Sequence, residues 1–158
     1  MHDNFFLHTK VSLMTLESNA TGFELRTKRV SQLKQLQPGA RVHVAGVCGT
    51  GTSAVALLLK EQGFIVSGSD KAFYPPMDAI VRKHCDLLFE EFSAAHITKE
   101  LDLVVIGNAL GASNPEVQQT IALEIPYCSM PDVFEAFLIG DRAHCPTSVV
   151  VAGTHGKT

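Results

Sequence analysis

The sequence predicts an α/β fold, with a Rossmann-like, mostly parallel sheet and helices on both of its faces. From residue 41 onward, short apolar segments that suit buried strands alternate with segments of helical character. The strand segments are apolar along nearly their whole length, which is typical of parallel strands covered on both sides. Glycine and polar residues follow several of these strands directly, and ligands of such sheets bind at those positions.

The expected elements follow from local signals. Gly63 ends the first helix, Pro75-Pro76 breaks the chain before the second, and Asn114 can cap a third that has Pro115 at its first position. The expected strands lie at 42–45, 64–66, 87–89, 103–106, 126–128 and 149–152, and the expected helices at 52–62, 77–84, 115–123 and 131–140.

The chain divides into three expected regions. Residues 1–39 are expected to be a partly disordered N-terminal extension, because their apolar residues have no sustained period and end at a Pro-Gly turn signal. Residues 40–145 should form one ligand-binding domain. Residues 146–158 should begin a second domain with a strand and a phosphate-binding loop.

The composition excludes several classes of protein. Hydrophobic residues make up 46% and charged residues 18% of the 158, a globular profile, and the net charge of −3 gives no broad attraction to nucleic acid or anionic membranes. No apolar run approaches the roughly 20 residues of a membrane span, and no secretory signal is evident. The four widely spaced cysteines contain no C-x-x-C pair, which argues against zinc and for free thiols in a reducing compartment. We therefore expect a cytoplasmic protein.

A glycine-rich segment, Gly46-Val-Cys-Gly-Thr-Gly51, lies between the first expected strand and helix. Such a turn places backbone N–H groups and a helix N-terminus where a diphosphate can sit. The segment keeps the first and third glycines of G-x-G-x-x-G, and Cys48 at the second argues against an ordinary nicotinamide dinucleotide. A plain turn with glycines for packing is the alternative. The candidate binding residues are Gly46, Cys48, Gly49, Thr50, Gly51 and Thr52.

Polar residues also follow the second and fourth strands. Asp70 lies 24 positions after Gly46, close to where an acidic residue meets ribose hydroxyls in dinucleotide folds. Ser69 and Asp70 are therefore candidates for ribose or base recognition, although an Asp that caps its own turn fits equally well. Asn108 could reach a phosphate or a sugar, or could bond its own backbone.

The segment Gly153-Thr154-His155-Gly156-Lys157-Thr158 follows an apolar strand and contains the G-K-T of a phosphate-binding loop. In such a loop Lys157 would contact the phosphates of ATP and the Thr158 hydroxyl would bind Mg²⁺. The strict motif would need a glycine at Val151, so a chance match is the alternative. The helix that should orient the loop amides does not follow in this sequence, so we expect the chain alone to bind ATP poorly.

Together the segments Gly46–Gly51, Gly68-Ser69-Asp70 and Gly153–Thr158 resemble the Mur ligase family. The resemblance covers residues 41–158, and residues 1–40 have no counterpart. Further similarities point to members of the family that act in peptidoglycan recycling. They are Cys48, Tyr74-Pro-Pro-Met77, Ile106-Gly-Asn-Ala109, Asn114-Pro115 and Ile125-Pro-Tyr127.

The resemblance implies an ATP- and Mg²⁺-dependent ligase that joins UDP-N-acetylmuramate to the murein tripeptide L-alanyl-γ-D-glutamyl-meso-diaminopimelate through an acyl phosphate. It implies that loop 46–51 holds the UDP diphosphate, that Ser69 and Asp70 face the uridine, and that Asn108 lies near the phosphates or the muramoyl sugar. Lys157 would be catalytic. Of the family's three domains, this chain would supply the UDP-sugar-binding one and the start of the ATPase, and we expect it to be inactive alone.

Three alternatives stay open. A family member that joins UDP-N-acetylmuramate to L-alanine shares the nucleotide-sugar and differs in the amine. An NAD-binding dehydrogenase domain is opposed by Cys48 and by the terminal Gly-Lys-Thr. A nucleotide-sensing module without catalysis is the third. The oligomeric state has no signal in the sequence.

Overall fold

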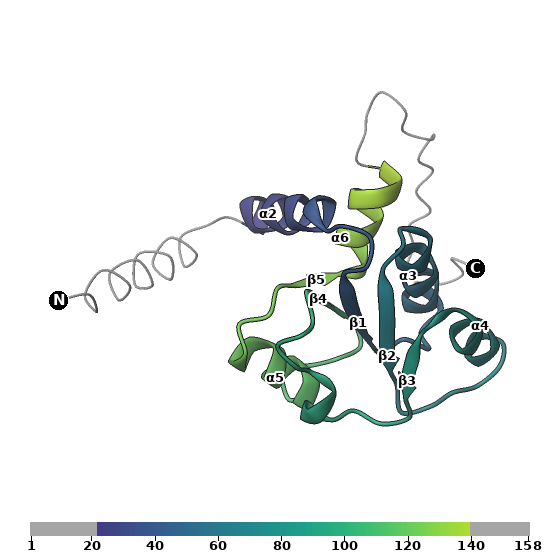
Figure 1. Ribbon diagram of the computed structural model, residues 1–158. Helices are drawn as coiled ribbons and strands as arrows, with labels where there is room; N and C mark the ends of the chain where they lie inside the picture. The colour runs from purple at the N-terminus through teal and green to yellow at the C-terminus, as the bar shows by residue number, and fades with distance from the viewer. Residues whose placement is uncertain (1–21, 140–158) are drawn as a thin grey trace, which may run out of the picture.

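A five-stranded parallel sheet forms the centre of the protein (Figure 1). The computed structural model describes residues 22–139. The strands lie in the order β3-β2-β1-β4-β5, so the Rossmann-like prediction is confirmed. The connections run in opposite directions from β1, and a crevice therefore opens between the carboxyl ends of β1 and β4. The strands are β1 (Arg41–Ala45), β2 (Ile65–Ser69), β3 (Leu87–Phe89), β4 (Leu103–Ile106) and β5 (Tyr127–Ser129).

The helices that connect the strands begin close to where the sequence predicts them. The side chain of Asn114 caps the helix after β4 by accepting hydrogen bonds from the amides of Glu116 and Val117. The last helical segment begins at Met130 and changes from α- to π-helical at Glu135. The expected strand at 149–152 lies outside the described residues. The elements are α3 (Thr50–Glu61), α4 (Met77–His84), η1 (Ala94–His96), α5 (Pro115–Ala122), α6 (Met130–Phe134) and η2 (Glu135–Ile139).

The two faces of the sheet are packed differently. Successive side chains of a strand point to opposite faces, and Val42 and Val44 of β1 lie in a large apolar cluster with residues of α3, α4 and α6. On the other face, Val104 belongs to a smaller cluster with Ile97 and Ile125. Between the two valines of β1 lies His43, which is fully buried. The face covered by α5 is therefore partly polar.

The helix α2 (Gly22–Gln35) lies within the segment where the sequence analysis predicted no element. It lies beside α6 (Figure 1) and contributes Val30 and Leu33 to the large apolar cluster. Most of its remaining residues are polar and exposed, so its sequence has only a weak amphipathic pattern. Contact with α6 and η2, rather than local propensity, accounts for this helix.

An ion pair fastens α2 to the start of α6. Asp132, which is 1% exposed, accepts hydrogen bonds from the Arg29 guanidinium at 3.1 Å and from the amide and hydroxyl of Ser129 at 2.9 and 2.7 Å. Burial alone would raise the pKa of Asp132, but the bonds from Ser129 and Arg29 together hold it below its ordinary value. The carboxylate is thus ionised at neutral pH and joins the two helices.

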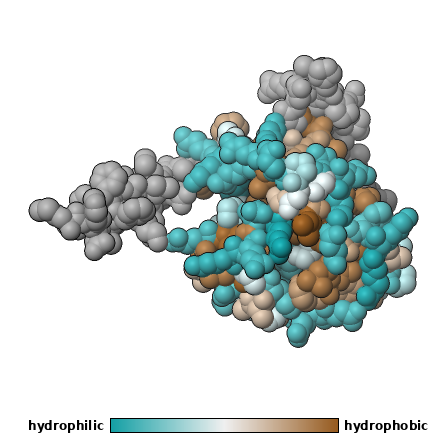
Figure 2. Space-filling view, in the orientation of Figure 1, coloured by the Kyte–Doolittle hydropathy of each residue, from teal (hydrophilic) through white to brown (hydrophobic). Residues whose placement is uncertain are grey.

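The surface drawn in Figure 2 is mostly hydrophilic and carries several separate apolar patches. Exposed apolar side chains in such proportions are usual for a folded domain. Within residues 22–139, no helix combines the length and the apolar character that crossing a bilayer requires.

Replacing Leu33 by Ala tests whether α2 is part of the folded domain. Leu33 is 0% exposed, so Leu33→Ala should lower the free energy of unfolding by about 2–5 kcal/mol. Phe23→Ala in the same helix is the control, because Phe23 is 78% exposed and its removal should change the free energy by no more than about 0.5 kcal/mol. Urea denaturation followed by circular dichroism measures both, and equal stability of Leu33→Ala and wild type would contradict the docking of α2.

Asp132 should make the stability of the domain depend on pH. Its folded pKa lies below the unfolded value of about 3.9, so its contribution is present above that value and is lost as the pH falls through the folded pKa. We expect Asp132→Asn to cost about 1–3 kcal/mol at pH 7, and less as the pH falls below about 4. Denaturation at pH 7 and pH 3 measures the difference in free energy of unfolding between wild type and Asp132→Asn, with Glu91→Gln at an exposed position as the control. A difference of the same size at both pH values would rule out this role.

Candidate functional site

The glycine-rich loop after β1 turns sharply at Gly46. Gly46 has a φ of 78°, a left-handed conformation that glycine adopts without strain. The amides of Gly46 and Val47 both donate to the carbonyl of Ser69 at the end of β2, at 2.8 and 3.0 Å. The hydroxyl of Thr52 donates to the carbonyl of Gly46 at 2.5 Å. Thr52, which is only 7% exposed, therefore stabilises the conformation of the loop from the protein interior.

The loop ends at the N-terminus of α3, which faces the crevice. Gly49 and Thr50 are exposed, and no side chain caps this helix. Helix geometry leaves the first amides of α3 without intrahelical acceptors, so they can bind an anion. Gly51 has a packing role, because a Cβ on it would overlap the sulfur of Met130.

Cys48, at the second glycine position of the motif, points into the core and is 2% exposed. Burial, assisted by Asp70 and Asp78, raises the pKa of its thiol to about 11, so the thiol stays protonated and unreactive at neutral pH. A ligand can therefore meet only the backbone of this residue. The Ser69 side chain is also out of reach of a ligand, because Ser69 is 0% exposed.

Asp70 is bound to the loop itself. One carboxylate oxygen accepts the amide of Cys48 at 2.9 Å, and the other accepts the amide of Lys71 at 2.8 Å. This geometry matches the alternative in which Asp70 caps its own turn, and it adds a contact across to the glycine-rich loop. Asp70 is half-buried, and its Oδ1 also lies 3.5 Å from the amide of Ala72, so Oδ2 is the oxygen with a lone pair that a sugar hydroxyl can use.

The opposite side of the crevice is formed by the residues after β4. Gly107 lies so close to β1 that a Cβ on it would come within 2.8 Å of the carbonyl of Ala45. The side chain of Leu110 lies over Gly46, 3.7 Å from where a Cβ would be. Asn108 is exposed between them. The glycine-rich loop and the β4–α5 loop are therefore in direct contact.

A cavity of about 440 Å³ lies beside the β4–α5 loop. This volume is within the usual range for small-molecule sites. Its walls come from the loops after β2, β3 and β4, and they include Lys71, Phe92, Leu110, Gly111, Ser113 and Asn114. The ammonium group of Lys71 lies 5.9 Å from the ring centre of Phe92. Lys71 and Phe92 carry no signal in the sequence, because they lie singly in separate loops that only the fold brings together.

A buried polar cluster lies beneath the loops and was also missed. Glu116 of α5 is 0% exposed and accepts hydrogen bonds from Ser69 at 2.6 Å and from His96 at 2.8 Å. His43 lies 3.5 Å from the same carboxylate. Burial alone would raise the pKa of Glu116, but the adjacent His43 ring and the hydrogen bonds from Ser69 and His96 together hold it below its ordinary value.

The predicted ATP-binding loop, Gly153–Thr158, lies outside the described residues, and so do its residues Lys157 and Thr158. Within residues 22–139, His, Cys, Asp and Glu side chains form no group of three or more suited to a metal ion.

Curated proteins similar to this chain include two kinds of UDP-N-acetylmuramate ligase. The chain is 39% identical over 118 residues to the UDP-N-acetylmuramate–L-alanyl-γ-D-glutamyl-meso-2,6-diaminoheptandioate ligase of Escherichia coli K12. It is 36% identical over 128 residues to the UDP-N-acetylmuramate–L-alanine ligase of Synechococcus sp. CC9311. The matches cover 75% and 78% of this chain but only 25% and 26% of those proteins, so the chain spans about a quarter of their length.

Two solved structures share the fold with similar sequences. A murein peptide ligase from Psychrobacter arcticus matches 63% of this chain and 21% of its own, with a TM-score of 0.58 and 32% identity. A ligase of the same kind from Neisseria meningitides matches 65% of this chain and 32% of its own, with a TM-score of 0.58 and 31% identity. The family model described as Mur ligase family, catalytic domain, matches residues 41–142, which is more than half of the sequence, and the chain therefore belongs to the Mur ligase family.

Proposed function

We propose that residues 40–145 bind UDP-N-acetylmuramate as part of a ligase that joins this nucleotide-sugar to L-alanyl-γ-D-glutamyl-meso-diaminopimelate. The observation that carries the proposal is that Leu110, which lines the cavity, packs over Gly46, so that the glycine-rich loop and the cavity are neighbours. A diphosphate at the loop would direct the rest of a nucleotide-sugar along this crevice. The relatives named above act on UDP-N-acetylmuramate according to their names.

The roles of the residues follow from their chemistry. The first amides of α3, at Thr50 and Gly51, suit a diphosphate, since the N-terminus of a helix favours anions. The ammonium group of Lys71 would add a positive charge at the same mouth, and the face of Phe92 suits stacking by the uracil ring. The side-chain amide of Asn108 would donate to a phosphate oxygen or bind a sugar hydroxyl, and the Asp70 carboxylate would accept a sugar hydroxyl.

The ATP-dependent part of the reaction is a further proposal. The loop Gly153–Thr158 would bind the phosphates of ATP, with Lys157 on the phosphates and Thr158 on Mg²⁺. The muramoyl carboxylate would take the γ-phosphoryl group of ATP, with release of ADP, and the amine of the peptide would then displace inorganic phosphate from the acyl phosphate to form the amide. Tyr74-Pro-Pro-Met77 and Asn114-Pro115 resemble segments of the family members that act in peptidoglycan recycling. This resemblance favours the tripeptide over L-alanine as the acceptor.

Cys48 favours this function over an NAD-binding dehydrogenase, because it stands where the dinucleotide motif has its second glycine. Asp70 does not separate the two functions, since both ligands carry ribose hydroxyls. A nucleotide-sensing module would bind the same ligand and differ only in the absence of catalysis.

The choice of ligand tests the proposal directly. The purified chain should bind UDP-N-acetylmuramate at least about tenfold more tightly than NAD, a difference of about 1.4 kcal/mol. Isothermal titration calorimetry with both ligands under identical conditions measures this, and UDP-N-acetylglucosamine shows how much the muramoyl carboxylate contributes. Tighter binding of NAD would overturn the proposal.

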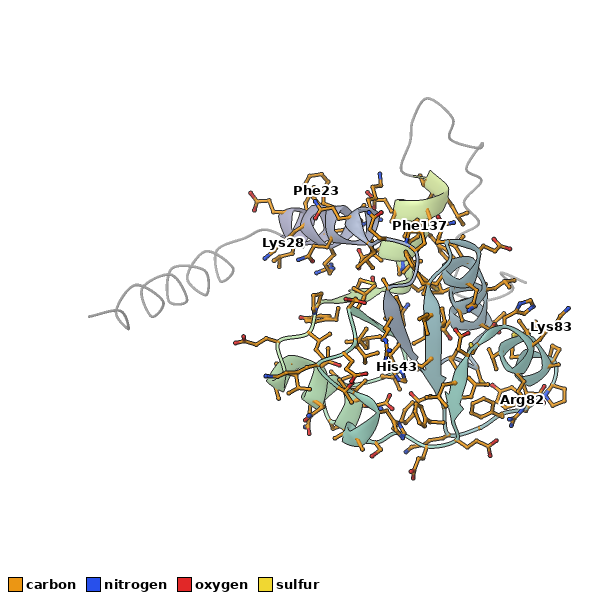
Figure 3. All side chains as sticks on the ribbon, in the orientation of Figure 1. Phe23, Lys28, His43, Arg82, Lys83 and Phe137 are labelled. Carbon is orange, nitrogen blue, oxygen red and sulfur yellow. The ribbon has the colours of Figure 1, made fainter. Side chains whose placement is uncertain are left out.

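Lys71 provides a test of the proposed diphosphate site. Lys71→Met should weaken UDP-N-acetylmuramate about two- to fivefold at low salt, because an exposed ion pair contributes up to about 1 kcal/mol. The effect should shrink at 0.5 M salt as screening increases. Lys83→Met is the matched control, since Lys83 carries the same charge at the outer side of α4 (Figure 3). Equal losses in the two variants would mean that overall charge, and not the site, is responsible.

A further inference from the structure

The buried carboxylate of Glu116 is fully satisfied on the polar face of the sheet. An ionised carboxylate removed from water costs several kcal/mol unless other groups pair with it. One oxygen of Glu116 accepts the hydroxyl proton of Ser69 at 2.6 Å. The other accepts from the ring of His96 at 2.8 Å and from the amide of Ser93 at 3.4 Å. The ring of Phe89 stacks on His96 with its centre 3.8 Å away, which limits the movement of that donor.

The proton count fixes the direction of the chain of hydrogen bonds from β1 to α5. Ser69 has one hydroxyl proton and donates it to Glu116, so its 3.2 Å contact with Nε2 of His43 requires that His43 donates. Nδ1 of His43 can then accept the hydroxyl proton of Ser67 at 2.9 Å. The resulting chain runs from Ser67 through His43 and Ser69 to Glu116. Figure 3 shows His43 inside the molecule, where this chain passes.

The same Ser69 holds the glycine-rich loop through its backbone. Its carbonyl accepts the amides of Gly46 and Val47, and the next residue, Asp70, accepts the amide of Cys48. Three consecutive amides of the loop are thus anchored by two residues at the end of β2. Because Ser69 carries both sets of contacts, the position of the loop depends on a side chain that Glu116 fixes from α5.

Glu116 is also attached to the wall of the cavity. Its backbone amide donates to the Asn114 side chain at 2.8 Å, and Asn114 and Pro115 line the cavity beside the loop. One buried residue therefore connects two parts of the proposed site that belong to different strands. Packing of α5 on the sheet alone would not need a charge, because an apolar residue of similar volume is often as stabilising.

We propose, on the basis of the proposed function, that Glu116 is a positioning residue for the nucleotide-sugar site. Through Ser69 it fixes the glycine-rich loop, and through the first turn of α5 it fixes the wall of the cavity. It does not touch the ligand. Its effect on affinity comes from holding the amides of the loop and the cavity wall in the arrangement that the ligand needs.

The main experiment compares Glu116→Gln with Val117→Ala. The amide nitrogen of Gln donates and cannot accept a hydrogen bond, so in Glu116→Gln either Ser69 or His96 must lose its bond or turn from donor to acceptor. We expect this variant to stay folded and to bind UDP-N-acetylmuramate about tenfold more weakly. Val117, the next residue of α5, is 8% exposed and has no bond to Ser69, so Val117→Ala should lower stability and leave the affinity unchanged. Unchanged affinity in Glu116→Gln, or an equal loss in Val117→Ala, would overturn the proposal.

Hydrogen exchange of the ligand-free protein provides a readout that does not depend on the proposed function. The amides of Gly46 and Val47 should exchange faster in Glu116→Gln than in wild type, and should keep the wild-type rate in Val117→Ala once global stability is taken into account. If the wild type does not bind UDP-N-acetylmuramate, the proposed function fails, but this comparison still decides whether Glu116 holds the loop. Equal exchange in wild type and Glu116→Gln would contradict that role.

Ser69→Ala tests the route of the effect and replaces Glu116→Gln if that variant does not fold. The single substitution should weaken binding and speed exchange at Gly46 and Val47. If Glu116 acts through Ser69, the double variant should bind no more weakly than the weaker of the two single variants. Losses that multiply in the double variant would show two independent effects and would contradict positioning through Ser69.

Discussion

The carbonyl of Ser69 is the constraint on which the proposed site depends. It accepts the amides of Gly46 and Val47, and these bonds turn the chain at the end of β1 back toward β2. The turn brings the N-terminus of α3 to the crevice where the strand order reverses, and glycine at position 46 permits the left-handed φ of 78° that it requires. A shift of this carbonyl would move the loop, the start of α3 and the contact with Leu110 together.

The sheet divides stability and positioning between its two faces. One face is covered by α3, α4, α2 and α6 and holds most of the apolar core. The other face is covered by η1 and α5 and buries a smaller apolar cluster together with Glu116, His43 and His96. Hydrophobic contact is not directional, whereas buried hydrogen bonds demand defined geometry. The polar face is thus the one that can fix the relative positions of the loops.

An acidic chain can hold an anion only through local geometry. The net charge of −3 gives no general attraction for a diphosphate, and Asp70 adds a negative charge near the loop. The amides of Cys48 and Lys71 satisfy that carboxylate, while the exposed start of α3 and the ammonium group of Lys71 offer positive potential. In this site the Asp70 carboxylate therefore holds the loop in shape, while the first amides of α3 and Lys71 are available to an anion.

The sequence alone determined what depends on neighbouring residues. The strands at β3 and β4, the bounds of α4, the cap at Asn114 and the family resemblance all rest on signals within a few positions. The strand order, the helix α2 and the roles of buried site residues could not be predicted in this way. Arg29 and Asp132 are 103 positions apart, and Ser69 and Glu116 are 47 apart. Such pairs form only when the chain packs, so tertiary structure decided that Ser69 faces Glu116 rather than a ligand, and that Lys71 and Phe92 share one cavity.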